Sequence, residues 1–255
     1  MATYNGEKFI RHQVDSILKQ LDSNDEIIVS DGNSTDSTLQ ILETYNDKRI
    51  KIYNLNRNLI RNSGGGEYSV IQKVKYNFIN ALSYATGDII FLCDQDDIWL
   101  ENKVKVCIDK LRHYPLVVHS SRIINNNYEV IQESSNNWLK GNYVSFFQTL
   151  ILSPFCGCEM AFTADVKESI LSNADIICRY MISHDHAIGY LVMCKYGRKN
   201  AHIFHDVLHL YRRHGNNVSS SSEKSSHSIY FKISYRIYDI LLYLRMMIRS
   251  FRNKL

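Results

Sequence analysis

The chain has 255 residues, of which 45% are hydrophobic and 22% charged, as is ordinary for a soluble globular protein of one or two domains. Its net charge of +4 would suit a partner carrying phosphate, but the basic residues are dispersed or confined to the tail, which argues against nucleic-acid binding. The sequence opens without a signal pattern, and no uncharged stretch reaches the roughly 18 residues that a membrane-spanning helix needs. We therefore expect a cytoplasmic protein.

The six cysteines do not have the spacing of a structural zinc site. None belongs to a CxxC pair, and in the only close pair one glycine separates Cys156 from Cys158. We expect all six to be reduced and most of them to be buried, as in cytosolic proteins.

The first hundred residues alternate helix and strand signals. Apolar residues at helical spacing indicate the helices, and short, almost entirely apolar runs indicate the strands. The predicted elements are, in chain order, a helix over 10–21, a strand over 26–30, a helix carrying Leu39 and Leu42 with Ser34 or Thr35 as its cap, a strand over 50–53, a helix over 70–82 and a strand over 88–93. Only two residues stand before Thr3, so a first strand is either very short or begins upstream of Met1.

This alternation predicts a parallel sheet with helices on both faces. Ligands of such sheets bind at the carboxyl ends of the strands, so we expect Asp31 and the acidic segment that begins at Asp94 to share one rim. The glycine-rich segment 64–66 is a weak candidate for cradling phosphate, because it lacks the Gly-Lys-Ser/Thr continuation of a phosphate-binding loop, and it is more typical of a mobile loop.

The second half of the chain shows a mixed pattern that we expect to complete the same domain with mixed strands. Its predicted elements are strands over 117–124, 159–163 and 202–210 and a helix over 185–193. A serine-rich stretch then indicates a linker, and residues 228–255 combine basic and apolar side chains, as in an amphipathic helix.

The most specific signal is Asp94-Gln95-Asp96-Asp97-Ile98-Trp99, at the end of a predicted buried strand. Three carboxylates in four positions repel one another unless a cation or solvent compensates them. Such hard oxygen ligands suit Mg²⁺ or Mn²⁺, which also bind substrate phosphates. The alternative is a solvated acidic turn that caps the following helix.

Several motifs in order resemble glycosyltransferase family 2, over roughly residues 1–220. They are Ala2-Thr3-Tyr4-Asn5-Gly6-Glu7, Asp31, Asn77-Phe78, the Asp94–Trp99 segment, Gly157-Cys158-Glu159-Met160, His184-Asp185 and Tyr211-Arg212-Arg213-His214-Gly215-Asn216-Asn217. Within the family, the sequence is most similar to the bacterial rhamnosyltransferase-like members of capsule and O-antigen synthesis. One departure is Asp31-Gly32-Asn33-Ser34, where the family usually has Asp-Asp-Gly-Ser; the first acid is kept and the second is missing.

The resemblance implies an α/β fold of the GT-A type, a mainly parallel sheet flanked by helices, with a C-terminal helical tail. Together with the serine-rich stretch and the basic, apolar end of the sequence, it divides the chain into a glycosyltransferase domain over 1–218, a linker over 219–227 and the tail over 228–255. Within the domain, residues 1–115 would bind the nucleotide and residues 116–218 the acceptor.

The resemblance also implies roles for individual residues. A dTDP- or UDP-sugar donor would be bound by Thr3, Tyr4, Glu7, Asp31, Asn77, Asp94, Arg212 and Arg213. The metal, Mn²⁺ or Mg²⁺, would be held by Asp94, Asp96 and His214. The acceptor would contact Trp99, Cys158, Glu159, Met160 and His184. Asp185 would be the catalytic base, taking the proton of the acceptor hydroxyl.

Structural alternatives stand beside these roles. Asp185 could serve only to cap the helix that follows it. The segment Arg212–His214 could be a surface turn that ends a strand, and Cys158 and Met160, taken alone, would be core residues.

The resemblance implies an inverting glycosyltransferase that acts on a lipid-linked glycan in bacterial surface polysaccharide synthesis, and the subgroup suggests rhamnose. A non-catalytic nucleotide- or glycan-binding module is the alternative, and a nucleotidyltransferase is a weaker one because the opening lacks a basic glycine-rich loop. The tail would either lie on the inner face of the membrane, where lipid-linked acceptors reside, or pack on the domain or a partner.

Overall fold

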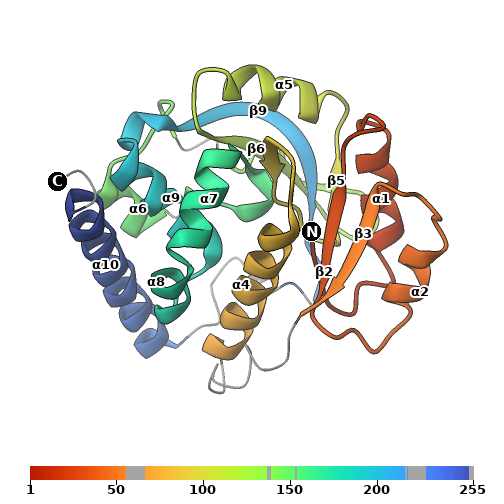
Figure 1. The fold of residues 1–255 in the computed structure, drawn as a ribbon, viewed down its shortest axis with the longest axis horizontal. Helices are drawn as coiled ribbons and strands as arrows, with labels where there is room; N and C mark the ends of the chain where they lie inside the picture. Colours follow the sequence, from red (N-terminus) through yellow and green to blue (C-terminus); the bar gives the residue numbers. More distant parts are fainter. Residues whose placement is uncertain (56–66, 137–138, 153, 216, 218–227, 253–255) are drawn as a thin grey trace.

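The computed structural model describes residues 1–55, 67–136, 139–152, 154–215, 217 and 228–252 (Figure 1). The glycine-rich segment 64–66 and the linker 219–227 lie outside the described residues.

The first sheet has three parallel strands in the order β1-β2-β3. They are β1 (Ala2–Thr3), β2 (Ile27–Asp31) and β3 (Ile50–Asn54). All five residues of β2 are buried, as expected for the central strand of a parallel sheet that is covered on both faces. In the register, Thr3 stands beside Asp31, so both strands end at the same rim. Strand β1 is two residues long here.

Helices α1 (Ile10–Leu18), α2 (Thr38–Glu43) and α4 (Glu67–Tyr84) belong to this half. The expected cap of α2 is wrong. Helix α2 begins after Ser37, and its first backbone N–H, from Thr38, donates to the Asp36 carboxylate. Ser34 is engaged elsewhere, because both its backbone N–H and its hydroxyl donate to Asp31.

The second sheet is mixed, as expected for the second half of the chain, but it also takes up β4, which corrects the expectation that this strand belongs to the parallel sheet. Its strands are β4 (Ile89–Phe91), β5 (Ile98–Trp99), β6 (Leu116–Ile124), β7 (Val130–Gln132), β8 (Met160–Thr163) and β9 (Ala201–Arg212), in the order β4-β8-β6-β9-β5 with β7 beside β6. Among the described residues, parallel pairing here is limited to β6 and β9. Strand β8 lies between β4 and β6 and runs antiparallel to both. Antiparallel neighbours do not need the crossover connection that joins parallel strands.

The remaining helices surround this sheet. They are α5 (Lys103–Leu111), α6 (Phe146–Leu152), α7 (Ala164–Ser172), α8 (Ala174–Arg179), α9 (His184–Lys195) and α10 (Ile229–Arg252), with short 3₁₀ turns η1 (Gly157–Glu159) and η2 (Arg198–Asn200). Helix α9 is buried along residues 186–193 and lies at the centre of the larger core. The tail forms the long helix α10, which packs beside α8 and α9 at the edge of the molecule (Figure 1).

Strand β9 connects the two halves of the molecule. It runs parallel to β6, and its last residues also pair with β5, where Leu210 stands beside Ile98. The strand therefore delivers Arg212 and the following residues to the loop that joins β4 to β5. Across the described residues, no helix is both long and apolar enough to span a bilayer.

None of the six cysteines forms a disulfide, as expected. The expectation that most are buried is only half met, because Cys93, Cys107 and Cys158 are buried and the other three are partly exposed.

Candidate active site

The loop that carries the acidic segment is tied to the end of β1 by Gln95. Its side-chain amide accepts a hydrogen bond from the backbone N–H of Tyr4 at 2.8 Å and donates to the Tyr4 carbonyl at 2.9 Å. Gly6 permits this approach, because a Cβ there would lie 2.3 Å from the Gln95 Oε1. Sequence reasoning missed Gln95, although its place inside the acidic motif was a signal.

Asp31 and Asn77 form a buried network at the same rim. The Asp31 carboxylate accepts hydrogen bonds from the Thr3 hydroxyl at 2.8 Å and from the Ser34 backbone N–H at 2.7 Å. The Asn77 amide donates to the Thr3 carbonyl at 3.0 Å and accepts from the Ser30 hydroxyl at 2.6 Å. The structure therefore brings three predicted donor-binding residues together and shows them supporting the rim.

Tyr4 and Glu7 lie at the surface of this rim. The Tyr4 side chain is 58% exposed, which leaves its ring free to stack on a flat ligand. The Glu7 carboxylate accepts a hydrogen bond from the Ser37 backbone N–H at 2.9 Å, just before α2.

Asp96 and His214 meet at the carboxyl end of β9. The His214 Nε2 lies 2.8 Å from the Asp96 Oδ2, and the imidazole stacks on the Phe9 ring at 4.7 Å between centroids. Asp94 is half-buried in the same loop. Burial and the charges of neighbouring carboxylates, Asp96 first among them, raise the pKa of Asp94 well above its usual range. Such mutually repelling carboxylates beside an imidazole fit a divalent cation.

Arg212 fastens the end of β9 to the acidic loop. Its backbone N–H donates to the Asp97 carboxylate at 2.9 Å, and its Nε donates to the Asp96 carbonyl at 3.0 Å. The guanidinium lies over the Tyr128 ring at 4.6 Å and is almost fully buried, and its Nη2 has no hydrogen-bond partner among the described residues. That free donor could meet a phosphate. Arg213 is half-buried, and its backbone N–H donates to the Ile124 carbonyl.

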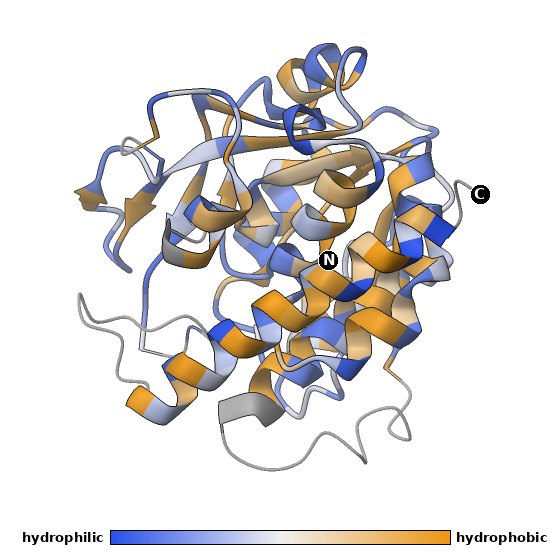
Figure 2. Cartoon of the chain, turned by 90° about the vertical axis from the view of Figure 1, so that its left-hand side faces the viewer, coloured by the Kyte–Doolittle hydropathy of each residue, from blue (hydrophilic) through white to orange (hydrophobic). Residues whose placement is uncertain are grey.

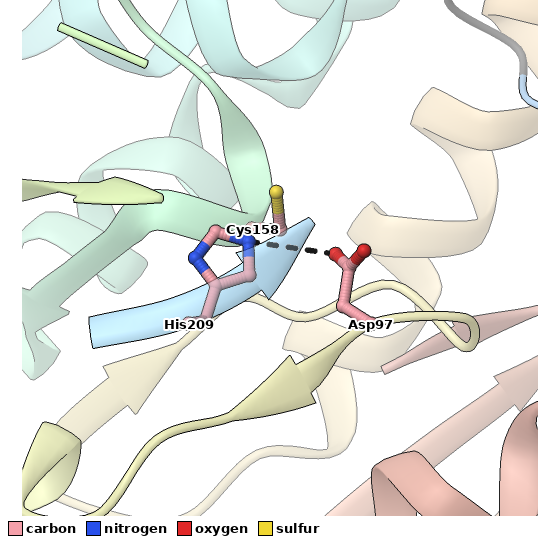
Figure 3. A group of neighbouring side chains, drawn as sticks. All are labelled: Asp97, Cys158 and His209. Atoms are coloured by element: carbon pink, nitrogen blue, oxygen red, sulfur yellow. Dashed lines mark ion pairs between the residues drawn. The ribbon is translucent and has the colours of Figure 1, made fainter. Parts of the chain in front are cut away.

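A second cluster of side chains of metal-ligating types includes Asp97 of the acidic loop. Asp97, Cys158 and His209 point toward one another, and their donor atoms all lie within 4.8 Å (Figure 3). All three are fully buried, with the His209 Nε2 3.6 Å from the Asp97 carboxylate. The buried ammonium of Lys103 acts electrostatically on Asp97 and His209, which disfavours a further cation there. We therefore interpret this group as support for the loop.

Asp185 stands in the first turn of α9, across from the acidic loop. Its carboxylate accepts hydrogen bonds from the His186 backbone N–H at 2.8 Å and from the Gly157 backbone N–H at 3.3 Å. Burial alone would raise the pKa of Asp185, but the neighbouring His184 and His186 lower it below its usual range. The group is therefore ionised at neutral pH, as a base requires. Gly157 is followed by Cys158, whose sulfur lies within 4.8 Å of the Asp97 carboxylate, so Asp185 stands close to the acidic loop, and its charge also raises the pKa of Asp94.

The five residues predicted to contact the acceptor are all buried. They are Trp99, Cys158, Glu159, Met160 and His184. Trp99 packs in the smaller core with the Lys103 ammonium 4.4 Å from its ring centre, and Met160 lies in the larger core. The Cys158 sulfur is 3.3 Å from that of Cys156.

Glu159 and His184 form the polar part of this buried layer. The Glu159 carboxylate accepts hydrogen bonds from Ser121 at 2.5 Å and Ser135 at 2.6 Å, and burial raises its pKa to about 7. The His184 ring stacks on Phe78 at 4.0 Å. Contact of these residues with an acceptor stays a prediction.

Solved structures show the class of fold to which this arrangement belongs. The chain superposes on Staphylococcus aureus TarS 1–349, crystallised with UDP-GlcNAc, with a TM-score of 0.63 at 20% identity over 98% of this chain and 70% of that one. A mannosyl-3-phosphoglycerate synthase from Rubrobacter xylanophilus gives a TM-score of 0.54 at 14% identity over 98% and 73%. The fold is that of the GT-A transferases.

Sequence comparison identifies the family. A model of glycosyl transferase family 2 matches residues 1–65 and 72–167, so the chain belongs to that family. The dTDP-rhamnosyl transferase RfbG of Shigella flexneri is 37% identical over 49% of this chain and 41% of its own length. The UDP-Glc:alpha-D-GlcNAc-diphosphoundecaprenol beta-1,3-glucosyltransferase WfgD of Escherichia coli is 32% identical over 57% and 49%. The match spans less than half of each of these relatives.

Proposed function

We propose that this chain is an inverting glycosyltransferase that moves a sugar from a nucleotide-diphosphate donor to a hydroxyl of a glycan. The observation that carries this proposal is the pairing of Asp96 with His214 near the ionised Asp185, which accepts a hydrogen bond from Gly157, the residue before Cys158, whose sulfur lies within 4.8 Å of the Asp97 carboxylate. A donor diphosphate belongs beside the first group and an acceptor hydroxyl beside the second. Such an arrangement serves catalysis, whereas a binding module has no need of the base.

Asp94, Asp96 and His214 would hold Mn²⁺ or Mg²⁺ together with the donor diphosphate. When bound, the cation supplies Lewis-acid stabilisation of the charge that develops on the departing diphosphate. The exposed Tyr4 ring would lie against the nucleotide, and the free Nη2 of Arg212 would donate to a phosphate oxygen.

Asp185 would perform the acid–base step. Its carboxylate takes the proton of the acceptor hydroxyl while that oxygen bonds to the anomeric carbon and the bond to the diphosphate oxygen breaks. One displacement on the face opposite the leaving group inverts the anomeric centre. The neighbouring His184 and His186 keep the pKa of Asp185 low, so the base is ready near pH 7.

The donor is proposed to be a dTDP- or UDP-sugar, with rhamnose as the first sugar to test. One relative is named for dTDP-rhamnosyl transfer, another for UDP-glucose, and TarS was crystallised with UDP-GlcNAc. Calorimetric titration with UDP, dTDP, GDP and CMP, each with and without Mn²⁺, tests this site. We expect tight binding of dTDP or UDP only with Mn²⁺. Failure of all four nucleotides to bind would overturn the proposed donor site.

The acceptor is proposed to be lipid-linked, with α10 holding the enzyme on an anionic membrane surface. The WfgD relative is named for an acceptor on diphosphoundecaprenol. The inward face of α10 packs on the domain through Phe231, Leu242 and Met246. Its outward face is apolar (Figure 2) and consists of Tyr230, Ile233, Ile237, Ile240, Leu241, Leu244, Ile248 and Phe251, all exposed.

Basic residues border this outward face. At 3.6 residues per turn, the exposed Arg245 and Arg252 fall beside the apolar stripe, where their side chains could reach lipid phosphates while the stripe enters the acyl boundary.

Vesicle flotation tests the membrane contact. We expect binding to vesicles that contain phosphatidylglycerol, weaker binding to phosphatidylcholine vesicles, and loss of binding in an Ile237→Asp, Leu244→Asp double variant. Equal flotation of the variant and the parent would refute the membrane role. A dimer in sedimentation that the double variant abolishes would show instead that the face joins two copies.

A further inference from the structure

The inward face of α10 contacts the residues on both sides of Asp185. On one side, the Ser183 backbone N–H donates to the Tyr235 hydroxyl oxygen at 3.0 Å, and the two hydroxyls lie 2.9 Å apart. On the other side, the His186 Nδ1 lies 3.2 Å from the Asp239 carboxylate. Tyr235 and Asp239 are one helical turn apart, so a single face of α10 holds one residue on each side of the proposed base, Ser183 and His186.

The contact between His186 and Asp239 is buried. The Asp239 side chain is 0% exposed and that of His186 is 5% exposed, and Arg236 reaches the second carboxylate oxygen at 3.2 Å. Burial alone would lower the pKa of His186, but the hydrogen bond to Asp239 and the charge of Asp185 raise it. Removing one member of a buried pair leaves the other uncompensated, so α10 is strongly tied to this point.

The segment that leads to Asp185 is held from the opposite side by α4. The Lys75 ammonium donates to the backbone carbonyls of Ile177 and Ile182, each at 3.0 Å, and also to that of Tyr180. Since the segment between α8 and α9 belongs to neither sheet, Lys75 on one side and α10 on the other determine where α9 begins.

We propose that Tyr235 and Asp239 are positioning residues for Asp185, so that the C-terminal helix is a working part of the active site. This inference rests on the proposed role of Asp185 as the base. A base must stay within hydrogen-bond reach of the acceptor hydroxyl, and a shift of about 1 Å can lower the rate about a hundredfold. The donor site, formed by β1, the acidic loop and the end of β9, does not involve α10.

The test compares two tyrosines on the inward side of α10. Tyr235→Phe removes the hydroxyl that contacts Ser183, whereas Tyr243→Phe removes one from a ring that stacks on Phe146 at 3.9 Å, away from Ser183. We expect Tyr235→Phe to lower the kcat of transfer at least tenfold, with the KM for the donor and the Tm unchanged, and Tyr243→Phe to keep the parental kcat. An unchanged kcat in Tyr235→Phe, or a kcat that falls only in step with donor affinity or Tm, would overturn the proposal.

Asp239→Asn tests the second contact in the same way, with Tm as the check that the variant folds. A double-mutant cycle then separates this inference from the assignment of the base. In an Asp185→Asn background, Tyr235→Phe should cause no further loss of the residual rate, because it acts through Asp185. A further tenfold loss there would refute positioning. Near-parental transfer by Asp185→Asn alone would instead refute the base and leave the role of α10 to be sought elsewhere.

Discussion

The His214 imidazole lies 2.8 Å from the Asp96 carboxylate and joins two segments 118 residues apart in the chain. The contact exists because β9 pairs with β5, where Leu210, four residues before His214, stands beside Ile98, two residues after Asp96. A late loop and the acidic segment therefore form one site before any ligand arrives. Preorganisation of this kind lowers the free-energy cost of ordering side chains around a bound ligand.

Asp96→Asn is expected to remove metal-dependent donor binding. The amide lacks the negative charge that a divalent cation needs, so calorimetry should show at least a tenfold loss of nucleotide affinity in the presence of Mn²⁺. Asp109→Asn, which changes an exposed carboxylate on α5, is the matched control and should bind like the parent. Mn²⁺-dependent affinity that survives in Asp96→Asn would exclude Asp96 as a metal ligand.

Asp185→Asn is expected to keep donor binding and lose transfer. General-base catalysis contributes about 10²–10⁴-fold to rate, and an amide cannot accept the acceptor proton. The measurement is single-turnover transfer at saturating donor, with nucleotide affinity determined on the same protein. Transfer at a near-parental rate would show that another group, or water alone, takes the proton.

Gly6→Ala is expected to destabilise the fold and weaken donor binding together. The new Cβ would lie 2.3 Å from the Gln95 Oε1, so the pairing of Gln95 with Tyr4 must open. Overpacking of this kind costs about 1–3 kcal/mol, which urea unfolding can measure. Gly141→Ala is the control, because a Cβ there meets nothing within 4 Å. Equal stability of the two variants would contradict the close approach.

Glu159→Gln is expected to change how stability depends on pH. The pKa of Glu159 is about 7 in the folded state against 4.5 for the free side chain, so between these values the folded protein binds more protons than the unfolded chain. The free energy of unfolding therefore carries a Glu159 contribution that is present below pH 4.5 and lost as pH rises through 7.

Glutamine does not titrate, so the variant should gain stability relative to the parent across this window. The difference should reach at most roughly 3 kcal/mol above pH 7 and shrink toward zero below pH 5. Urea unfolding of both proteins at several pH values measures it. A difference that does not vary with pH would show that Glu159 titrates normally.

Local chemistry in the sequence predicted much of the first half of the fold. The pattern of apolar and polar residues alone was enough to predict β2 and the polar turn that follows it. The rule that ligands bind where parallel strands end then correctly placed Asp31 on the same rim as the acidic loop. The periodicity of a strand does not show which other strand it pairs with in the sheet. The antiparallel insertion of β8 beside β4 was therefore beyond reach, although each strand was located.

Contacts between distant side chains were also invisible in the sequence. Lysine side chains are mostly exposed in folded proteins, yet those of Lys75 and Lys103 are fully buried, where backbone carbonyls accept their hydrogen bonds. Tyr235 and Asp239 lay in a segment whose basic and apolar residues suggested only an amphipathic helix. Nothing in that pattern indicates that its inward face meets Ser183 and His186.

The pairing of β6 with β9 contains an irregularity with a practical consequence. Val118 stands beside Ile203, but Ser120 stands beside Val207, so β9 takes up additional residues over a short distance. A one-residue slip in a regular strand would turn every later side chain to the opposite face. Here the additional residues of β9 lie between Ile203 and Val207, where the pairing with β6 already changes register. Chimaeras between family members should therefore be joined within 204–206. A junction there leaves unchanged the pairing of β9 with β6 over the residues that lead to Arg212.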